Sequence, residues 1–437
     1  MSVSAVTAPV ARQAGVRFRR IFENPPCPPL QRGGRETMMA MPIKSVLEKL
    51  WEVEPEAELW WDSSPLVFGS FRRRLLDRAP DKPLMTAWLD RLYSPNNRPE
   101  ENLLRGVTTN PRLSFNAVKE NPEPWTAWID TWIRREGCKD PETVFWETYK
   151  EVIRRGALAL MPQFLASGRK HGFHSAQADP RCRLDPEKMV TQGVELHRLS
   201  PNIMIKIPGT QEGYEAIRRL TALGIPTNNT ISLVIPQFLA CMSAVADGLR
   251  EARAAGVDLS GWRSVITAMS SRFGTLGDLH LQAAERGIAL SETDVRWAEI
   301  ALIKKACTLV RSHPAYRGKM LVSSMRVSPI VGGEAHVWHL EKLAGADLVF
   351  TLPPAFLEAL LLKTPNLEFT RQFEEPVPAR VLEKLLKIPY FERGLREDGY
   401  SPAEFNTHPA LLSTARDFCV ATQGMVEFVA ARVAAAA

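Results

Sequence analysis

The regular alternation of short apolar runs with longer amphipathic stretches is the feature that most constrains the fold of this chain. From about residue 46 onward, apolar runs end in polar, Gly- or Pro-containing turns, and helix-like segments such as 211–223 and 236–254 follow them. The runs with the length of a strand are 57–61, 105–108, 173–178, 203–207, 225–231, 264–268, 320–323 and 348–352. Strand–helix alternation of this kind predicts a parallel α/β sheet, and about eight such units favour a closed (β/α)₈ TIM barrel over an open sheet.

Several segments exceed what a minimal barrel needs. Residues 80–104 and 119–165 are predicted to be helical insertions, and residues 364–437 a C-terminal helical extension. Residues 1–45 are crowded with proline and arginine, which predicts a disordered or loosely packed N-terminal extension before a barrel domain of residues 46–437. Two alternatives for this extension stay open, a natural start at one of the methionines near position 40 and a transit peptide.

Composition narrows the function classes. The formal net charge is +6, but beyond the arginine-rich start the charges are mixed in sign, which favours anionic substrates over nucleic acid as partners. No uninterrupted apolar run of about 18 residues appears, so we expect no membrane span. The six cysteines are scattered without a CxxC pair, which is typical of reduced thiols in a cytoplasmic protein.

Polar side chains follow the predicted strands where a barrel gathers its functional residues, at the carboxyl ends. They are Asp62, Thr109, Asn110, Gln177, Lys206, Asn228, Thr230, Arg272 and Arg326. Several have a purely structural alternative, since Asp is a common helix N-cap, Asn-Pro a common turn, and arginines often form ion pairs. Their shared placement at strand ends nevertheless predicts one common site.

Lys206 is the most unusual of these residues because it interrupts the apolar run 203–207. A buried lysine has a lowered pKa, and the neutral amine attacks carbonyl groups. The alternative is a lysine whose stem lies along the strand while its ammonium reaches solvent.

Three motifs carry a resemblance to a known family. Residues 106–111 (GVTTNP), 204–213 (MIKIPGTQEG) and 224–230 (GIPTNNT) resemble the signature segments of the transaldolases. The resemblance extends from about residue 58 to at least residue 363.

The resemblance implies a role for each strand-end residue. Lys206 would form a Schiff base with a ketose phosphate, and Asp62 would be the general acid and base. Thr109 and Asn110 would hold hydroxyls of the donor, and Asn228 and Thr230 would position the catalytic water or the imine. Arg272 and Arg326 would bind the substrate phosphate, as guanidinium groups commonly do. No metal or other cofactor is expected, because the protonated imine is the electron sink.

The sequence also departs from the family pattern. Gln177 stands where transaldolases carry a glutamate that activates water, although related fructose-6-phosphate aldolases also have glutamine there. Glutamine cannot act as a base. Met269 replaces an aromatic residue, and Val234 lies where the fifth-strand motif has serine.

The resemblance therefore implies a cytoplasmic transferase, a monomer or small homo-oligomer, that moves a dihydroxyacetone unit between sugar phosphates, as in the pentose phosphate pathway. Two alternatives stay open. Gln177 favours a class I aldolase that releases the ketone, and the three departures together leave room for a sugar-phosphate-binding barrel without turnover.

Two pairs of histidines are candidates for a second functional site. His336 and His339 are three residues apart, as a metal-binding pair on a helix would be, but no third ligand is apparent. We therefore expect a surface helix at this position. His171 and His174 flank the N-terminal side of the third strand, where barrels rarely carry out chemistry.

Overall fold

The predicted parallel barrel is confirmed. The computed structural model describes residues 43–436, so the predicted N-terminal extension lies outside the described residues except for residues 43–45, and its boundary stays a prediction. Eight parallel strands close in the order β1-β10-β7-β6-β5-β4-β3-β2. Their bounds are β1 Glu58–Trp61, β2 Leu104–Thr108, β3 Phe173–Gln177, β4 Ile203–Pro208, β5 Thr227–Ser232, β6 Ser264–Met269, β7 Lys319–Ser323 and β10 Leu348–Leu352. Each agrees with an expected run to within about two residues, the usual scatter of element ends.

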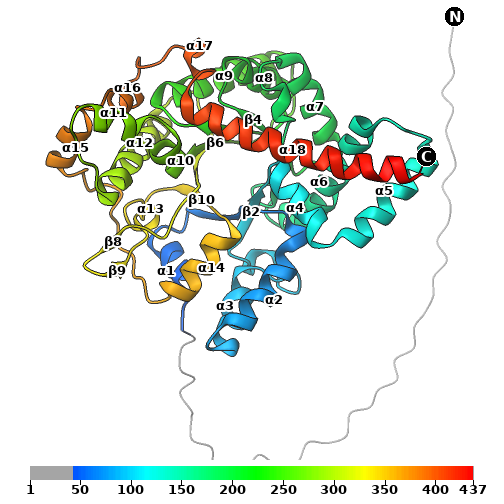
Figure 1. Ribbon diagram of the computed structural model, residues 1–437, viewed down its shortest axis with the longest axis horizontal. Coiled ribbons are helices and arrows are strands. Elements are labelled where there is room, and N and C mark those ends of the chain that lie inside the picture. The colour runs from blue at the N-terminus through cyan, green and yellow to red at the C-terminus, as the bar shows by residue number, and fades with distance from the viewer. Residues whose placement is uncertain (1–42, 437) are drawn as a thin grey trace, which may run out of the picture. The chain divides into compact units, whose positions relative to one another are not determined.

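The helices surround this barrel (Figure 1). In chain order they are α1 Val46–Val53, α2 Phe68–Arg78, α3 Lys82–Leu92, α4 Pro111–Glu120, α5 Pro122–Glu136, α6 Pro141–Ala166, α7 Pro186–Arg198, α8 Gln211–Ala222, α9 Ile235–Ala254, α10 Ser270–Leu276, α11 Leu279–Glu285, α12 Glu292–Ser312, α13 Trp338–Glu341, α14 Pro354–Lys363, α15 Ala379–Leu385, α16 Pro389–Leu395, α17 Pro402–Phe405 and α18 Pro409–Ala436. Short 3₁₀ turns (η1 Pro65–Val67, η2 Pro99–Glu101, η3 Pro180–Cys182) and a hairpin of β8 Ile330–Val331 with β9 Glu334–Ala335 complete the chain. The predicted helical insertions are present as α3, α5 and α6.

Many helices begin with proline behind a polar cap, which explains where they start. Asn110, Asp140 and Asp185 each accept a hydrogen bond from a backbone N–H in the first turn of the helix that follows, α4, α6 and α7. Proline at the first helical position has no N–H to leave unpaired and already holds a helical φ. The Asn-Pro at 110–111 is therefore a helix start as well as a family motif.

The barrel interior changes from apolar to polar along its axis. Because side chains alternate between the two faces of a strand, every second residue of each strand points inward. Below the polar residues, toward the amino ends of the strands, the inward residues form one apolar cluster, called here the lower layer. Its strand residues are Trp60, Phe173, Met204, Val265, Leu321 and Val349. Two residues further along their strands, the inward positions are polar and include Asp62, Ser175, Lys206, Thr267 and Thr351. This change places the polar residues at the carboxyl end of the barrel.

Gly106 permits the close packing of the lower layer. A Cβ at Gly106 of β2 would lie 2.7 Å from Cε2 of Trp60, well inside van der Waals contact. The glycine of the GVTTNP motif therefore makes room for the largest side chain of the barrel core.

The long C-terminal helix α18, red in Figure 1, packs beside α4, α5, α6 and α10. By length and composition alone it is the one helix, among residues 43–436, that could cross a membrane. Within the protein it buries one face, including Leu411, Met425 and Val429. Its charged residues form ion pairs, such as the one between Arg432 and Asp130 of α5. These contacts hold α18 against the helices of the barrel domain.

Candidate active site

Lys206 lies inside the barrel with its side chain buried. It is 4% exposed, so the alternative of an ammonium group reaching solvent is excluded. Its Nζ donates a hydrogen bond to the carbonyl oxygen of Thr109 at 3.3 Å. Burial lowers the pKa of Lys206, Asp62 opposes this effect, and the charge of Arg272 adds to it. The site therefore favours the neutral amine, the form that adds to a carbonyl carbon.

Asp62 follows β1 and faces the same interior. Its Oδ1 accepts a 2.6 Å hydrogen bond from the hydroxyl of Thr108, whose oxygen lies 2.6 Å from the hydroxyl of Thr351. Since the single proton of Thr108 goes to the carboxylate, Thr351 must be the donor in the second bond. Ser64, not Asp62, caps the turn that follows, so the helix-cap alternative is wrong for Asp62.

The electrostatics of Asp62 suit proton transfer. Burial raises the pKa of its carboxyl group, while Lys206, the Thr108 hydroxyl and Arg272 act in the opposite direction. A carboxyl group with a raised pKa both accepts and returns a proton closer to neutral pH than an exposed aspartate does.

The two lateral neighbours of Lys206 differ in how firmly they are held. Asn228 of β5 donates to the Ser175 hydroxyl at 2.9 Å and accepts from the Thr267 hydroxyl at 2.7 Å, so its amide orientation is fixed by three strands. Gln177 of β3 is 1% exposed, and neither Nε2 nor Oε1 has a hydrogen-bond partner within residues 43–436. A buried amide without partners is costly, and a substrate hydroxyl can satisfy it.

Thr109 and Asn110 make different contacts from the roles predicted for them. The Thr109 hydroxyl points out of the barrel and donates to the carbonyl oxygen of Ser175 at 2.9 Å, so this residue touches Lys206 through its backbone. Asn110 uses its Oδ1 to accept from the N–H of Leu113. Their roles toward a substrate stay predictions. Thr108, which sequence reasoning missed, is the inward threonine of this motif. The two-residue alternation of a strand, starting from the inward Gly106, identifies it.

Thr230 lies at the end of β5, next to a strained residue. Its hydroxyl lies 4.0 Å from the sulfur of Met269 on β6, a weak hydrogen bond. The next residue, Ile231, has φ of 58°, which is rare for a β-branched side chain. Gln237 of α9 holds this turn, since its amide contacts the carbonyls of Gly209 and Ile231 and the N–H groups of residues 233 and 234. Gln237 gave no signal in the sequence because its partners lie in strand β5 and in the two loops that follow β4 and β5.

Arg272 lies with Lys206 and Asp62, and its charge acts on both. Its Nη1 also contacts the Thr414 hydroxyl at 3.2 Å and the Asp417 carboxylate at 3.3 Å, both on α18. The structural alternative for Arg272, an ion pair, is therefore present. A phosphate bound to Arg272 would compete with the Asp417 carboxylate for this guanidinium group.

Arg326 follows β7, and its side chain is exposed. Its backbone N–H donates to Nδ1 of His339 at 3.3 Å. Nδ1 is therefore an acceptor, so the proton of this imidazole is on Nε2, which lies 2.8 Å from the carboxylate of Glu299. The expectation of a surface helix carrying His336 and His339 is wrong, because His336 lies before α13 and His339, on α13, is fully buried against Glu299 of α12.

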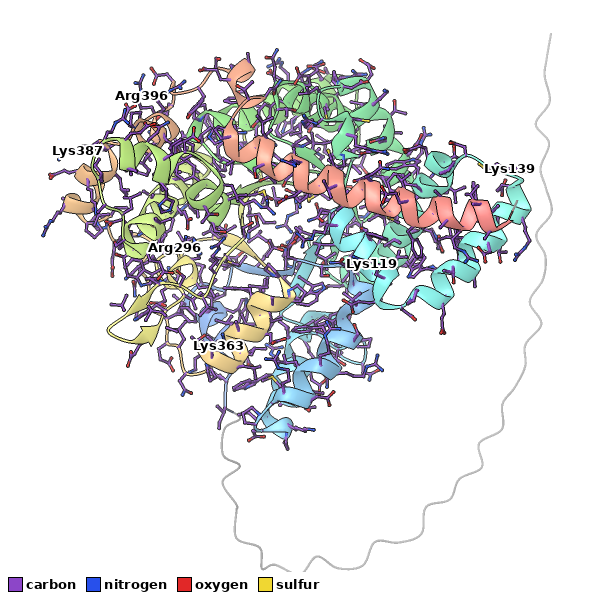
Figure 2. All side chains as sticks on the ribbon, in the orientation of Figure 1. Lys119, Lys139, Arg296, Lys363, Lys387 and Arg396 are labelled. Carbon is purple, nitrogen blue, oxygen red and sulfur yellow. The ribbon has the colours of Figure 1, made fainter. Side chains whose placement is uncertain are left out.

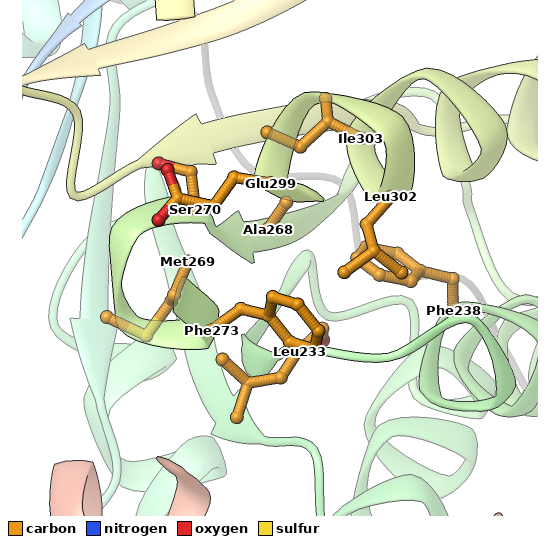
Figure 3. A pocket seen from close by; sticks show the side chains of 10 residues that line it. Leu233, Phe238, Ala268, Met269, Ser270, Phe273, Glu299, Leu302 and Ile303 are labelled. Carbon is orange, nitrogen blue, oxygen red and sulfur yellow. The ribbon is translucent and has the colours of Figure 1, made fainter. Parts of the chain in front are cut away.

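Arg296, Glu299 and His339 thus form a buried charged cluster. It lies between α10, which carries Arg272, and the segment after β7, which carries Arg326. Glu299 also pairs with Arg296 at 2.8 Å, and both belong to α12. Figure 2 labels Arg296. On its other side Glu299 touches α10, where a Cβ on Gly274 would lie 2.2 Å from its Oε1. Figure 3 shows Glu299 with Met269 and Phe273 around a mainly apolar pocket beside β6. Sequence reasoning missed Glu299 because helix α12 contains several similar charged residues.

Comparison with known proteins agrees with this geometry. The family model described as "Transaldolase/Fructose-6-phosphate aldolase" matches residues 88–391. Asp62 lies before the matched range. Transaldolase 1 of Streptomyces avermitilis is 35% identical over 181 residues, covering 41% of this chain and 47% of the relative. The transaldolase of Mycobacterium ulcerans is 32% identical over 188 residues, covering 43% and 50%.

A longer match is to the transaldolase of Thiobacillus denitrificans, which is 29% identical over 293 residues and covers 64% of this chain and 77% of the relative. The chain spans about half the length of the other two relatives. Because the family model covers more than half of the sequence and the barrel places a buried lysine where the motif has it, the chain belongs to the transaldolase/fructose-6-phosphate aldolase family.

Proposed function

We propose that this protein transfers a dihydroxyacetone unit between sugar phosphates through an imine on Lys206. The observation that carries the proposal is a buried lysine of lowered pKa that shares the barrel interior with a buried carboxylate of raised pKa. Nucleophile and proton carrier are then matched to one reaction.

In this proposal the amine of Lys206 adds to the C2 carbonyl of the donor, and loss of its oxygen as water leaves a protonated imine. Cleavage of the C3–C4 bond sends its electron pair into the imine and forms an enamine. The C4 hydroxyl gives its proton to Asp62, and the fragment leaves as an aldehyde. Addition of the enamine to an acceptor aldehyde reverses these steps, and water then releases the product.

The remaining residues would hold the substrate. Asn228 and Thr230 would position the imine or its water, Thr109 and Asn110 would hold donor hydroxyls, and the two arginines would bind phosphate. The imine itself is the electron sink, so the reaction requires no metal or other cofactor. We place the protein in the cytoplasm as a monomer or small homo-oligomer, without a membrane or nucleic acid partner.

The second candidate is a class I aldolase that uses the same imine and releases the ketone. Gln177 favours it, because both of its side-chain polar atoms are free to bind substrate but neither is a base. A third candidate, a binding barrel without turnover, follows from the departures at Gln177, Met269 and Val234. Borohydride trapping separates the third from the others, and product analysis with and without an acceptor aldehyde separates the first two.

Arg326→Ala is expected to raise KM for phosphorylated donors about ten- to a hundredfold and to leave KM for dihydroxyacetone nearly unchanged. A charge-assisted contact contributes about 1.5–3 kcal/mol, which corresponds to that range. Steady-state kinetics with both donors tests it, with the exposed Arg380→Ala as the matched control. Equal changes for the two donors would rule out a phosphate role for Arg326.

Gln177→Glu is expected to raise the ratio of transfer to cleavage, by up to about 10²-fold, because a carboxylate accepts a proton that an amide cannot. Transfer rate, cleavage rate and melting temperature are measured on the same preparation. Gln163→Glu is the control, since Gln163 is equally buried but bonds the carbonyl of Leu104 outside the site. A drop in melting temperature like that of the control, with an unchanged ratio, would show that Gln177 has only a structural role.

A further inference from the structure

The end of the barrel opposite to Lys206 contains a cavity of about 540 Å³. It lies where strands begin, with Glu58 and Lys319 as the first residues of β1 and β7 and Arg263 directly before β6. The loop 168–171 between α6 and β3 completes its wall. Because all strands of the barrel are parallel, this cavity is at the face away from the site described above.

The floor of the cavity is an ion cluster that neutralises its own carboxylate. Glu58 is 4% exposed and accepts hydrogen bonds from Arg263 at 2.5 Å and from the indole of Trp60 at 3.0 Å, and Lys319 lies 3.2 Å away. Burial raises the pKa of Glu58, but Arg263, His171 and Lys319 together outweigh this effect and hold the pKa well below the usual range. Glu58 is therefore already paired and does not attract a further cation.

The rim adds positive charge that is only partly balanced, since the charge of Arg169 acts on the carboxylate of Asp258. Arg169, Lys170 and Arg317 line the cavity and are exposed, and within residues 43–436 no carboxylate lies within 4.0 Å of their charged atoms. Together with the floor, the lining holds five Lys or Arg side chains and two carboxylates, those of Glu56 and Glu58. Asp347, which pairs with Lys319 at 2.6 Å, reduces the excess to two positive charges. Low-dielectric walls concentrate the field of such a charge within a cavity.

The lining also has a hydrogen-bond donor to spare. Nε1 of Trp262 is buried and has no hydrogen-bond partner in the described part of the chain. Nδ1 of His171, by contrast, faces the Glu58 carboxylate at 3.6 Å and already has an anionic neighbour. The indole N–H of Trp262 is therefore the neutral donor that an anionic ligand could engage.

The position of Arg169 depends on two unusual backbone features. Its φ is 67°, a left-handed conformation that is uncommon outside glycine, and it follows Gly168 with φ of 62°. Its Cδ lies 3.2 Å from where Gly261 would carry a Cβ, so the absence of a side chain there lets Arg169 extend along the cavity wall.

We propose that this cavity binds a small molecule carrying at least two phosphate-type anionic groups. Its volume is within the range of about 300–1,000 Å³ usual for small-molecule sites. Arginine binds such groups with two parallel hydrogen bonds, and the indole N–H of Trp262 supplies a further donor. Free pyrophosphate and the phosphate tail of a nucleotide share this chemistry.

The test is isothermal titration of the full chain with inorganic phosphate, pyrophosphate and ATP. Two variants distinguish binding at the active site from binding in this cavity. Arg272→Ala with Arg326→Ala removes the phosphate-binding arginines proposed at the active site, and Arg169→Gln with Lys170→Gln and Arg317→Gln removes the rim. The control variant replaces Lys139, Lys363 and Lys387 by Gln, which changes the net charge equally on exposed residues away from the cavity (Figure 2).

We expect pyrophosphate to bind the arginine double variant and the control variant alike, and at least about tenfold more weakly to the rim variant, with an affinity that falls as salt rises. ATP binding tighter than pyrophosphate would identify a nucleotide as the source of the phosphates, and equal affinities a free phosphate compound. Loss of binding only in the double variant, or an equal loss in the control, would overturn the proposal. So would tight binding of a 20-mer oligonucleotide by a protein that does not bind pyrophosphate. Because binding is measured without turnover, the result is independent of the proposed activity.

Discussion

Lys206→Met is expected to abolish covalent trapping of a ketose phosphate by borohydride, with the protein still folded. The amine is the only group in the proposed reaction that forms a covalent bond to the donor, so its loss leaves no residual imine route. Methionine has a similar length without a charge, and the position is buried in an otherwise apolar strand, so the barrel tolerates it. Mass spectrometry after borohydride treatment reports the adduct, and circular dichroism reports the fold.

Lys304→Met is the matched control for this experiment. Burial lowers the pKa of Lys304 to about 8, so this lysine also has a reactive amine, but it donates to the carbonyls of Gln372 and Glu375 on the outside of the barrel. The control variant should be trapped like the natural protein. An adduct that persists in Lys206→Met, or that maps to Lys304, would contradict the assignment of the nucleophile.

The rate of trapping should also depend on pH in a definite direction. Imine formation requires the neutral amine, and the pKa of Lys206 lies below its ordinary 10.5. The rate should therefore rise with pH and level off at a lower pH than for an exposed lysine. Asp62 raises this pKa, so removing its charge should move the midpoint lower still.

Asp62→Asn is expected to lower turnover by about 10²–10⁴-fold, the usual size of a general acid–base contribution. The amide oxygen can still accept the hydrogen bond from Thr108, so the geometry around the site is retained while proton transfer is lost. Trapping of the imine should continue, because Asp62 acts on the C4 hydroxyl rather than on the amine. A variant with unchanged turnover would remove Asp62 from the reaction.

Thr108→Val separates the charge of Asp62 from its hydrogen bond. The Thr108 hydroxyl lowers the pKa of this carboxyl group against the effect of burial, so its loss should raise that pKa further. Asp62 must be ionised to accept a proton, and its pKa in the folded protein lies above the ordinary 3.8. The acidic limb of the turnover profile should therefore move to higher pH in Thr108→Val. An unchanged limb would show that another group controls it.

The sequence by itself determined the fold and the centre of the site. Apolar runs separated by helix-length segments can bury both faces of their strands only in a parallel sheet covered by helices, and all eight expected strands are present. A single lysine within the run 203–207 was conspicuous because charged residues are rare in such strands. Local spacing was sufficient for both conclusions.

The tertiary structure decided which side chains meet. Alternation along β2 points Thr108 inward, but barrel closure brings it to Asp62, 46 positions away, and adds Thr351, 243 positions away. The burial of His339 against Glu299, 40 positions away, likewise depends on how α12 packs, which no pattern around the histidine contains. Strand register and helix packing are set by the whole core at once, because shifting a strand by one residue exchanges its inward and outward faces. A residue type near a strand end therefore indicates where chemistry is located, whereas the contacts that tune it depend on residues far apart in the chain.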